Sequence, residues 1–282
     1  MRSEREMLEL IINTAKEDGR IRGVIMSGSR ADVHAPRDIY QDYDIVYLVD
    51  EVTPFWNNTA WLEEKFGRIL LLQTPEIMSL IPPDNDGSFV FLTIFEDGNR
   101  IDLCVTSKPY VDNGEPAIVL LDKTGELSGI KPREDFWYIK PPEEKLFHDC
   151  CNEFHWCLNN VAKGIARDEL PYVMGMLNSP VRDALNIMTD WYIGAENDFK
   201  VSAGKMGKYY KKYLPEELYK MYAATYSDSD YDNIWNAVFT ACELFRRLAE
   251  SVAGKFGYTY NITEDENIID YMNKVKNNIL GD

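Results

Sequence analysis

The first half of the chain contains short runs of hydrophobic residues, which is the pattern of β-strands. Residues 21–26 are mainly apolar, and residues 43–49, 89–95 and 100–105 are rich in β-branched and aromatic side chains. The last two runs are joined by residues 96–99, whose Glu-Asp-Gly-Asn sequence is typical of a tight turn. The pattern therefore predicts four strands, of which the last two form a hairpin.

The second half changes to the spacing of helices. From residue 143 to about residue 167, apolar side chains recur on one side of a predicted helix. Residues 181–193 and residues 233 to about 252 are amphipathic in the same way. The segment Asn178-Ser179-Pro180 predicts the start of the first of these, because proline is favoured in the first turn of a helix. We therefore expect a core of packed helices in this half.

Prolines mark the change between the two patterns. Pro132 and the pair Pro141-Pro142 interrupt regular structure. We place the boundary there, which gives a first domain of residues 1–135 and a second domain of residues 136–282. A chain of 282 residues with 45% hydrophobic residues is long enough for two domains. The predicted fold class is α+β, with a mixed β-sheet domain followed by a helical domain.

Three aspartates stand in or beside the predicted strands. Asp42 and Asp44 are separated by one residue, so they point to the same face of a strand with Cα atoms about 6.6 Å apart. Asp44 and Asp102 each have apolar neighbours on both sides, where an unpaired charge is costly unless a cation neutralises it. If their strands are adjacent, the three carboxylates gather around one point. Such a group could bind Mg²⁺, which prefers carboxylate oxygens and substrate phosphates.

A turn of small residues follows the first predicted strand. Gly28 has no side chain, so the backbone can approach an anion, and Ser29 adds a hydroxyl. Arg30 could supply a positive charge to a phosphate. A Gly-Ser turn alone is typical of many loops, but beside three carboxylates it indicates a site for a nucleoside triphosphate.

The joint pattern resembles the nucleotidyltransferase superfamily, which has a Gly-Ser turn, an Asp-x-Asp strand end and a later carboxylate on another strand. Within that superfamily, nearly the whole chain is similar to the aminoglycoside 6-adenylyltransferases, which modify streptomycin. One difference is Ser27, where the family has a glutamate. The similarity is carried by residues 20–22, 28–30, 41–45, 95–99, 101–103, 149–154 and 163–164.

The resemblance implies a reaction and roles for several residues. The protein would transfer AMP from ATP to a hydroxyl of a streptomycin-like aminoglycoside, release pyrophosphate and give antibiotic resistance. Asp42, Asp44 and Asp102 would be catalytic and would hold Mg²⁺, as two ions, with Asp102 either completing the metal site or accepting the proton of the hydroxyl. Glu153, on the outer side of a predicted helix, is the candidate for binding the cationic acceptor. The implied nucleotide-binding residues are Gly28, Ser29, Arg30 and Lys205.

Charge and composition narrow the partners. The chain has 47 acidic and 30 basic residues, a net charge of −17, whereas a protein that binds nucleic acid needs a basic groove. No apolar stretch approaches the roughly 20 residues that span a bilayer, and the charged N-terminus has no signal-peptide core. Five cysteines, an odd number, fit a reducing compartment. We expect a cytoplasmic protein with neither nucleic acid nor membrane as a partner; the oligomeric state stays open, with a monomer as the simplest case.

Two alternatives fit the same residues. One is a nucleotidyltransferase that acts on another small-molecule or protein hydroxyl. The other is a protein of the same fold that binds ATP or a cationic drug without turnover. The three carboxylates favour an enzyme, because a protein that only binds its ligand has no evident need for all of them.

Overall fold

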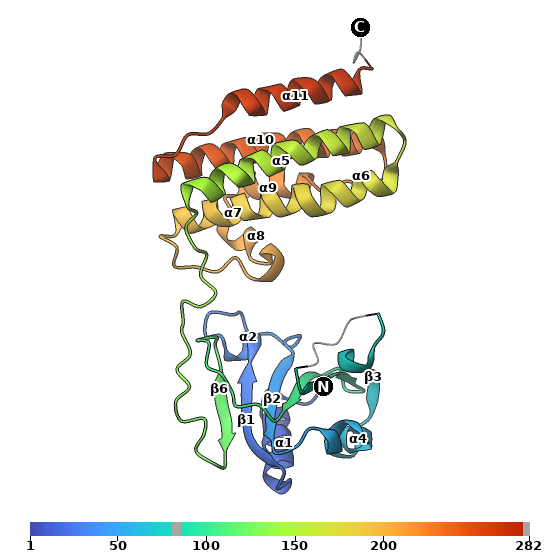
Figure 1. The fold of residues 1–282 in the computed structure, drawn as a ribbon, viewed down its shortest axis with the longest axis vertical. Coiled ribbons are helices and arrows are strands. Elements are labelled where there is room, and N and C mark those ends of the chain that lie inside the picture. Colours follow the sequence, from blue (N-terminus) through green and yellow to red (C-terminus); the bar gives the residue numbers. More distant parts are fainter. Residues whose placement is uncertain (81–85, 279–282) are drawn as a thin grey trace. The chain divides into compact units, whose positions relative to one another are not determined.

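The computed structural model describes residues 1–80 and 86–278, and the chain divides into two compact units, Met1–Phe136 and Trp137–Asp282 (Figure 1). Each unit has a hydrophobic core of its own. The first unit contains a mixed six-stranded sheet, and the regular structure described in the second is helical. The expected α+β fold, with a sheet domain followed by a helical domain, is confirmed.

The six strands of the first unit lie in the order β3-β4-β5-β2-β1-β6. Strands β2 and β5 are parallel, and every other neighbouring pair is antiparallel. The four predicted strands are present as β1, β2, β4 and β5, while β3 and β6 at the two edges were not predicted. In chain order the elements are α1 (Glu4–Glu17), β1 (Ile21–Ser27), α2 (Gly28–Ala31), β2 (Tyr43–Val49), α3 (Thr53–Trp56), α4 (Ala60–Phe66), β3 (Ile69–Gln73), the 3₁₀ turn η1 (Pro75–Ile77), β4 (Ser88–Phe95), β5 (Arg100–Thr106) and β6 (Ile118–Asp122).

The two faces of the sheet differ. Tyr43 and Tyr47 of β2 point to the face that packs in one core with residues of α1 and α4, and the Tyr47 hydroxyl donates to the carbonyl of Ile11 in α1 at 2.8 Å. Because side chains alternate along a strand, Asp44 points to the opposite face. There Asp44 and Asp102 are only partly buried, whereas Leu48 packs into a smaller cluster. The alternation thus leaves the carboxylates on the less covered face.

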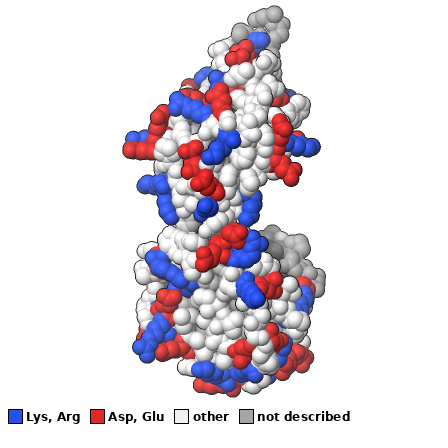
Figure 2. All heavy atoms as spheres, turned by 90° about the vertical axis from the view of Figure 1, so that its left-hand side faces the viewer, with Lys and Arg blue, Asp and Glu red and all other residues white. Residues whose placement is uncertain are grey.

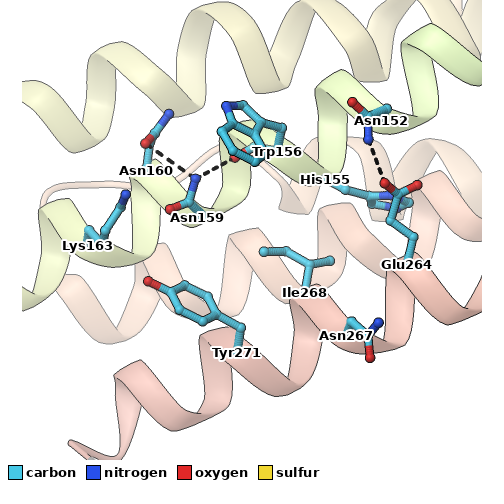
Figure 3. Close-up of a pocket in the computed structure, with 10 residues that line it drawn as sticks. All are labelled: Asn152, His155, Trp156, Asn159, Asn160, Lys163, Glu264, Asn267, Ile268 and Tyr271. Carbon is cyan, nitrogen blue, oxygen red and sulfur yellow. Dashed lines mark hydrogen bonds and ion pairs between the residues drawn. The ribbon is translucent and has the colours of Figure 1, made fainter. Parts of the chain in front are cut away.

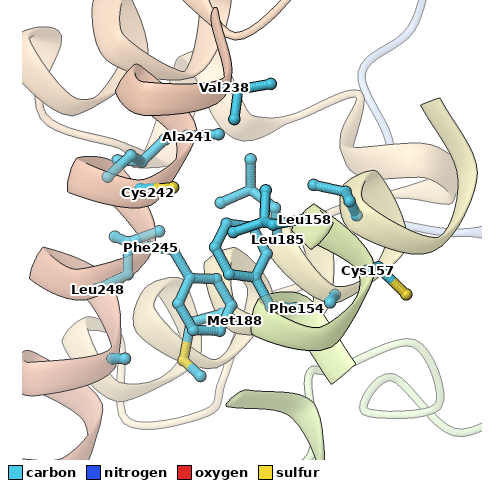
Figure 4. Packing of buried hydrophobic residues seen from close by; sticks show 14 of the residues in the cluster. Phe154, Cys157, Leu158, Leu185, Met188, Val238, Ala241, Cys242, Phe245 and Leu248 are labelled. Atoms are coloured by element: carbon cyan, nitrogen blue, oxygen red, sulfur yellow. The ribbon is translucent and has the colours of Figure 1, made fainter. Parts of the chain in front are cut away.

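Long helices build the second unit (Figure 1). Figure 4 shows the core between α5, α7 and α10, where the rings of Phe154 and Phe245 stack with centroids 3.9 Å apart. The helices and turns are α5 (Glu144–Ala166), α6 (Leu170–Met176), the π turn η2 (Leu177–Val181), α7 (Arg182–Glu196), the 3₁₀ turn η3 (Lys205–Gly207), α8 (Tyr210–Tyr213), α9 (Glu216–Ala224), α10 (Tyr231–Phe256) and α11 (Ile262–Lys276).

The segment Asn178-Ser179-Pro180 does not begin a helix, as the sequence predicted. Pro180 lies inside η2, which joins α6 to α7 without a break in the helical path. A π turn widens the backbone locally, so the missing N–H and the ring of a proline can be accommodated within a helix.

The helices and the cysteines bear on two expectations from the sequence, namely no membrane-spanning segment and no framework of disulfides. In the described residues, no helix combines the length and hydrophobicity that a membrane span requires. All five cysteines are free thiols, and four of them are buried.

Candidate active site

The centre of the candidate site is the parallel pairing of β2 with β5. Asp44 and Asp102 are direct partners in this ladder, so their Cα atoms are about 4.8 Å apart and their side chains share one face of the sheet. Asp42 precedes Asp44 by two residues, immediately before β2 begins. The two strands are therefore adjacent, as expected. Asp44 and Asp102 lie side by side, and Asp42 lies two residues away on the same face of the sheet.

Gly28 approaches this pair from the end of β1. Ser27 is the ladder partner of Asp44, and Gly28 follows it with φ = 65°. A Cβ atom built on Gly28 would lie 1.9 Å from Oδ2 of Asp44. Only glycine therefore fits between the turn and the carboxylate. Ser29 is next in the turn, and its hydroxyl accepts a hydrogen bond from Nε2 of Gln41 at 3.2 Å.

Arg100, which the sequence reasoning missed, belongs to the same site. It precedes Asp102 by two residues on β5, so both point to one face. Its Nε and Nη2 donate to Oδ1 and Oδ2 of Asp102, each at 2.7 Å, and its Nη1 lies 3.4 Å from Oδ2 of Asp42. The available signal was the i, i+2 spacing between Arg100 and Asp102 within a predicted strand.

The electrostatics of Asp44 follow from its neighbours. Burial, together with the negative charges of Asp102 and Asp42, raises the pKa of Asp44 to about 6, and Arg100 opposes this shift. Burial also raises the pKa of Asp42. The site thus concentrates negative charge that one guanidinium only partly neutralises, and such a site attracts a further cation.

The carboxylates do not, however, surround a single point as expected. Among residues 1–80 and 86–278, no three His, Cys, Asp or Glu side chains are gathered closely enough to form a ready-made metal site. Instead of meeting one another, Asp42 and Asp102 both contact Arg100, whose guanidinium lies between ligands that a metal ion would need. The donor set itself fits Mg²⁺: all three groups are carboxylates that share a face, and Mg²⁺ takes oxygen ligands and retains part of its water shell. Asp42, Asp44 and Asp102 are the residues that would hold it.

Arg30 is placed differently from the phosphate-binding role that was expected. Its side chain is buried, and its Nε and Nη2 donate to the carbonyls of Asp42 and Gln41 at 3.0 and 2.8 Å. The guanidinium also lies over the ring of Tyr43, 3.9 Å from its centroid. In this arrangement Arg30 fixes the backbone that leads into β2, and so positions Asp42.

Two candidates from the sequence lie in the other unit. Lys205 is exposed in η3. Gly204, just before η3, and Met206 and Gly207 within it have positive φ values of 70°, 57° and 72°. Glu153 is exposed on α5 and accepts a hydrogen bond from the thiol of Cys157 at 3.2 Å. Their assignments to the triphosphate and to the acceptor stay predictions.

The helical unit also has a pocket of about 420 Å³ between α5 and α11 (Figure 3). Trp156 is 66% exposed above it, Tyr271 lies on the facing helix, and Nδ2 of Asn152 donates to Oε1 of Glu264. His155 is buried at its side, and burial lowers the pKa of its imidazole. Glu153 does not line this pocket, so the pocket is distinct from the acceptor site that was predicted from Glu153.

Acidic and basic side chains are interspersed over the face of each unit that is drawn in Figure 2. No continuous basic band crosses this face, which agrees with the net charge of −17.

Comparisons with known proteins cover almost the whole chain. Residues 1–275 match the profile of the family described as Streptomycin adenylyltransferase. The chain is 37% identical over 277 residues to the Aminoglycoside 6-adenylyltransferase of Bacillus subtilis (strain 168), covering 96% of this chain and 97% of the relative. It is 35% identical over 283 residues to the Aminoglycoside 6-adenylyltransferase of Campylobacter jejuni, covering 98% and 96%. A crystal structure of an aminoglycoside 6-adenyltransferase from Bacillus subtilis is 35% identical, covers 98% of this chain and 99% of that one, and has a TM-score of 0.49.

Proposed function

The chain belongs to the Streptomycin adenylyltransferase family, and from this premise we propose that it transfers AMP from ATP to a hydroxyl of an aminoglycoside. Streptomycin or a close analogue is the proposed acceptor, pyrophosphate is the second product, and antibiotic resistance is the consequence. The observation that carries the proposal is the pairing of β2 with both of its neighbours. Its register with β5 sets Asp44 beside Asp102, and its pairing with β1 brings Gly28 so close to Asp44 that only a glycine fits there.

The proposed chemistry is an in-line displacement at the α-phosphorus. When bound at the carboxylates, Mg²⁺ would neutralise charge on the triphosphate and on the departing pyrophosphate. Gly28 lets the backbone approach the phosphates, since it adds no side chain in front of Asp44. Asp42 and Asp44 would hold the cation. Asp102 would either share it, in which case the proton of the acceptor hydroxyl passes to solvent water, or would itself take that proton. The oxygen of that hydroxyl bonds to phosphorus as the bond to pyrophosphate breaks.

The acceptor half of the proposal rests on charge and on the relatives. Their names describe an acceptor that is an aminoglycoside. An aminoglycoside is polycationic, and a chain with a net charge of −17 attracts it electrostatically. Glu153 is exposed and remains the proposed carboxylate for an amino or guanidino group.

Pyrophosphate release tests the proposal. The full chain is incubated with ATP, Mg²⁺ and, in separate reactions, streptomycin, kanamycin or neomycin, and mass spectrometry detects the AMP adduct. Release with streptomycin is the expected result, and release with another compound only would reassign the acceptor. Binding without release would favour the sequestering alternative, and no response to any aminoglycoside would reject the proposal.

A further inference from the structure

A single guanidinium connects the two strands at the candidate site. Arg100 makes two parallel hydrogen bonds to Asp102 at 2.7 Å and lies 3.4 Å from a carboxylate oxygen of Asp42. A bidentate arginine–carboxylate pair is among the stronger ion pairs in proteins, because both hydrogen bonds are charge-assisted. Arg100 therefore occupies ligand oxygens that a divalent cation would need.

The third carboxylate is left without such a partner. Among the described residues, Asp44 takes part in no side-chain hydrogen bond or ion pair, although the negative charges of Asp42 and Asp102 act on it. Arg100 thus pairs directly with Asp42 and Asp102, and it acts on Asp44 only through its charge. One positive charge therefore faces three carboxylates, and part of the negative charge of the site has no partner.

Burial does not lock Arg100 in this position. Its side chain is 41% exposed, and those of Asp42 and Asp102 are 37% and 20% exposed. A partly exposed arginine has a flexible stem, and its ion pairs exchange readily with other anions. The triphosphate of a nucleotide offers such an anion, and guanidinium groups bind phosphate in the same two-pronged way as they bind carboxylate.

We propose that Arg100 is a resident counter-cation, which competes with free divalent cations for Asp42 and Asp102 and transfers to the triphosphate when a metal–nucleotide complex binds. It is a positioning residue for the proposed reaction, and this inference rests on the nucleotide half of the proposed function. Its consequence is an order of binding: free metal binds weakly, and metal binds well only together with a nucleotide that gives Arg100 a new partner.

The test is the variant Arg100→Gln in the full chain. Free Mn²⁺ binding to the nucleotide-free protein is measured by electron paramagnetic resonance, and binding of the Mn²⁺ complex of a non-hydrolysable ATP analogue by calorimetry. We expect free Mn²⁺ to bind about tenfold more tightly than in the wild type, and the metal–nucleotide complex about tenfold more weakly. Arg100→Lys keeps the charge but not the two-pronged geometry, so both shifts should be smaller.

Arg68→Gln is the matched control. Arg68 lies in the same unit and pairs with Glu96 at 3.0 Å, so the variant also removes one positive charge from an ion pair. Neither affinity should change more than about twofold in this variant, because Arg68 contacts none of the three aspartates and its exposed charge is screened by solvent and salt.

The proposal predicts that Arg100→Gln shifts the affinities for free Mn²⁺ and for the metal–nucleotide complex in opposite directions. A purely structural role of Arg100 does not predict this. If Arg100→Gln weakens the binding of both ligands, Arg100 merely holds the carboxylates in place, and the proposal is wrong. Unchanged affinity for free Mn²⁺, or none detected in the variant, overturns it as well. If the two affinities shift in opposite directions but no aminoglycoside causes pyrophosphate release, Arg100 keeps its role and the proposed acceptor is wrong.

Discussion

Gly28 is the residue at which local conformation and the candidate site meet. Its φ of 65° already disfavours a side chain, and a Cβ would collide with the carboxylate of Asp44. We expect Gly28→Ala to lower the free energy of unfolding by about 1–3 kcal/mol and adenylyl transfer by about 100-fold or more, because Asp44 must move. Urea unfolding and pyrophosphate release measure the two effects.

Gly125→Ala separates strain from collision. Gly125 has φ = 79°, and nothing lies within 4 Å of an added Cβ. This variant therefore has the backbone strain of Gly28→Ala without the clash, so it should cost about 1 kcal/mol of stability and leave activity near that of the wild type. Equal activity in both variants would contradict the role given to Gly28.

Asp44 is the carboxylate whose removal should separate function from stability. Asp44→Asn keeps the shape of the side chain but removes a charge that burial and two like charges make costly. We expect adenylyl transfer to fall about 1000-fold or more, while the thermal midpoint stays the same or rises slightly. Asp50→Asn, in an exposed aspartate just beyond the other end of β2, should change neither. Turnover near the wild-type level in Asp44→Asn would refute the metal assignment.

The two arginines show how far single residues can be interpreted from sequence. Arg30 follows a Gly-Ser turn, and only the folded structure shows that its guanidinium donates hydrogen bonds to the carbonyls of Gln41 and Asp42. Arg100 could have been found, because residues two apart on a strand share a face. The carboxylates themselves were identifiable from their apolar neighbours. The sequence did not show which groups the two arginines contact, because these contacts depend on how distant segments pair in the sheet.

At the scale of elements, α7 and α8 are joined by a partly buried polar contact. The hydroxyl of Tyr210 donates to Oδ1 of Asp190 at 2.7 Å and to the carbonyl of Asn186 at 3.0 Å. Burial nevertheless raises the pKa of Asp190 to about 6, above the value of about 3.9 expected for an unfolded chain. The folded state therefore binds this proton more tightly than the unfolded state does.

The stability of the folded state therefore depends on pH through Asp190. Above pH 6 the ionised Asp190 destabilises the folded state, and this cost disappears as the pH falls from 6 to 4. We expect Asp190→Asn to raise the free energy of unfolding by about 1–2 kcal/mol at pH 7.5 and to have little effect at pH 4.5. Urea unfolding at both pH values measures this, with Asp183→Asn on the exposed side of α7 as the control. A destabilised variant at pH 7.5 would show that the hydrogen bond from Tyr210 outweighs the burial cost.

Helices and strands were predicted best where the spacing of apolar residues stays the same along the whole element. The strand over residues 43–49 and the helix that begins near residue 143 have nearly the predicted bounds. The sequence failed at Pro180, since a π turn is a local irregularity that no periodicity signals. It also missed β3, five residues long, because a short edge strand with exposed leucines has no alternating pattern.

At the scale of the whole molecule, the hydrophobic cores of the two units share no residue. The first core contains Phe91, which lies against Phe89 with ring centroids 4.9 Å apart. The second contains Phe245, stacked on Phe154. Because hydrophobic stabilisation is local to the surface that is buried, each unit should respond to a cavity in its own core only.

Phe245→Ala and Phe91→Ala form a matched pair for this expectation. Both rings are fully buried, so each substitution should cost about 3–5 kcal/mol in its unit. Hydrogen exchange read by mass spectrometry should then show lost protection in α5, α7 and α10 for Phe245→Ala, with β2 and β5 unchanged, and the reverse for Phe91→Ala. Loss of protection in both units from either variant would mean that the chain unfolds as one cooperative body. In that case the carboxylates of the sheet would depend for their position on the helical core as well.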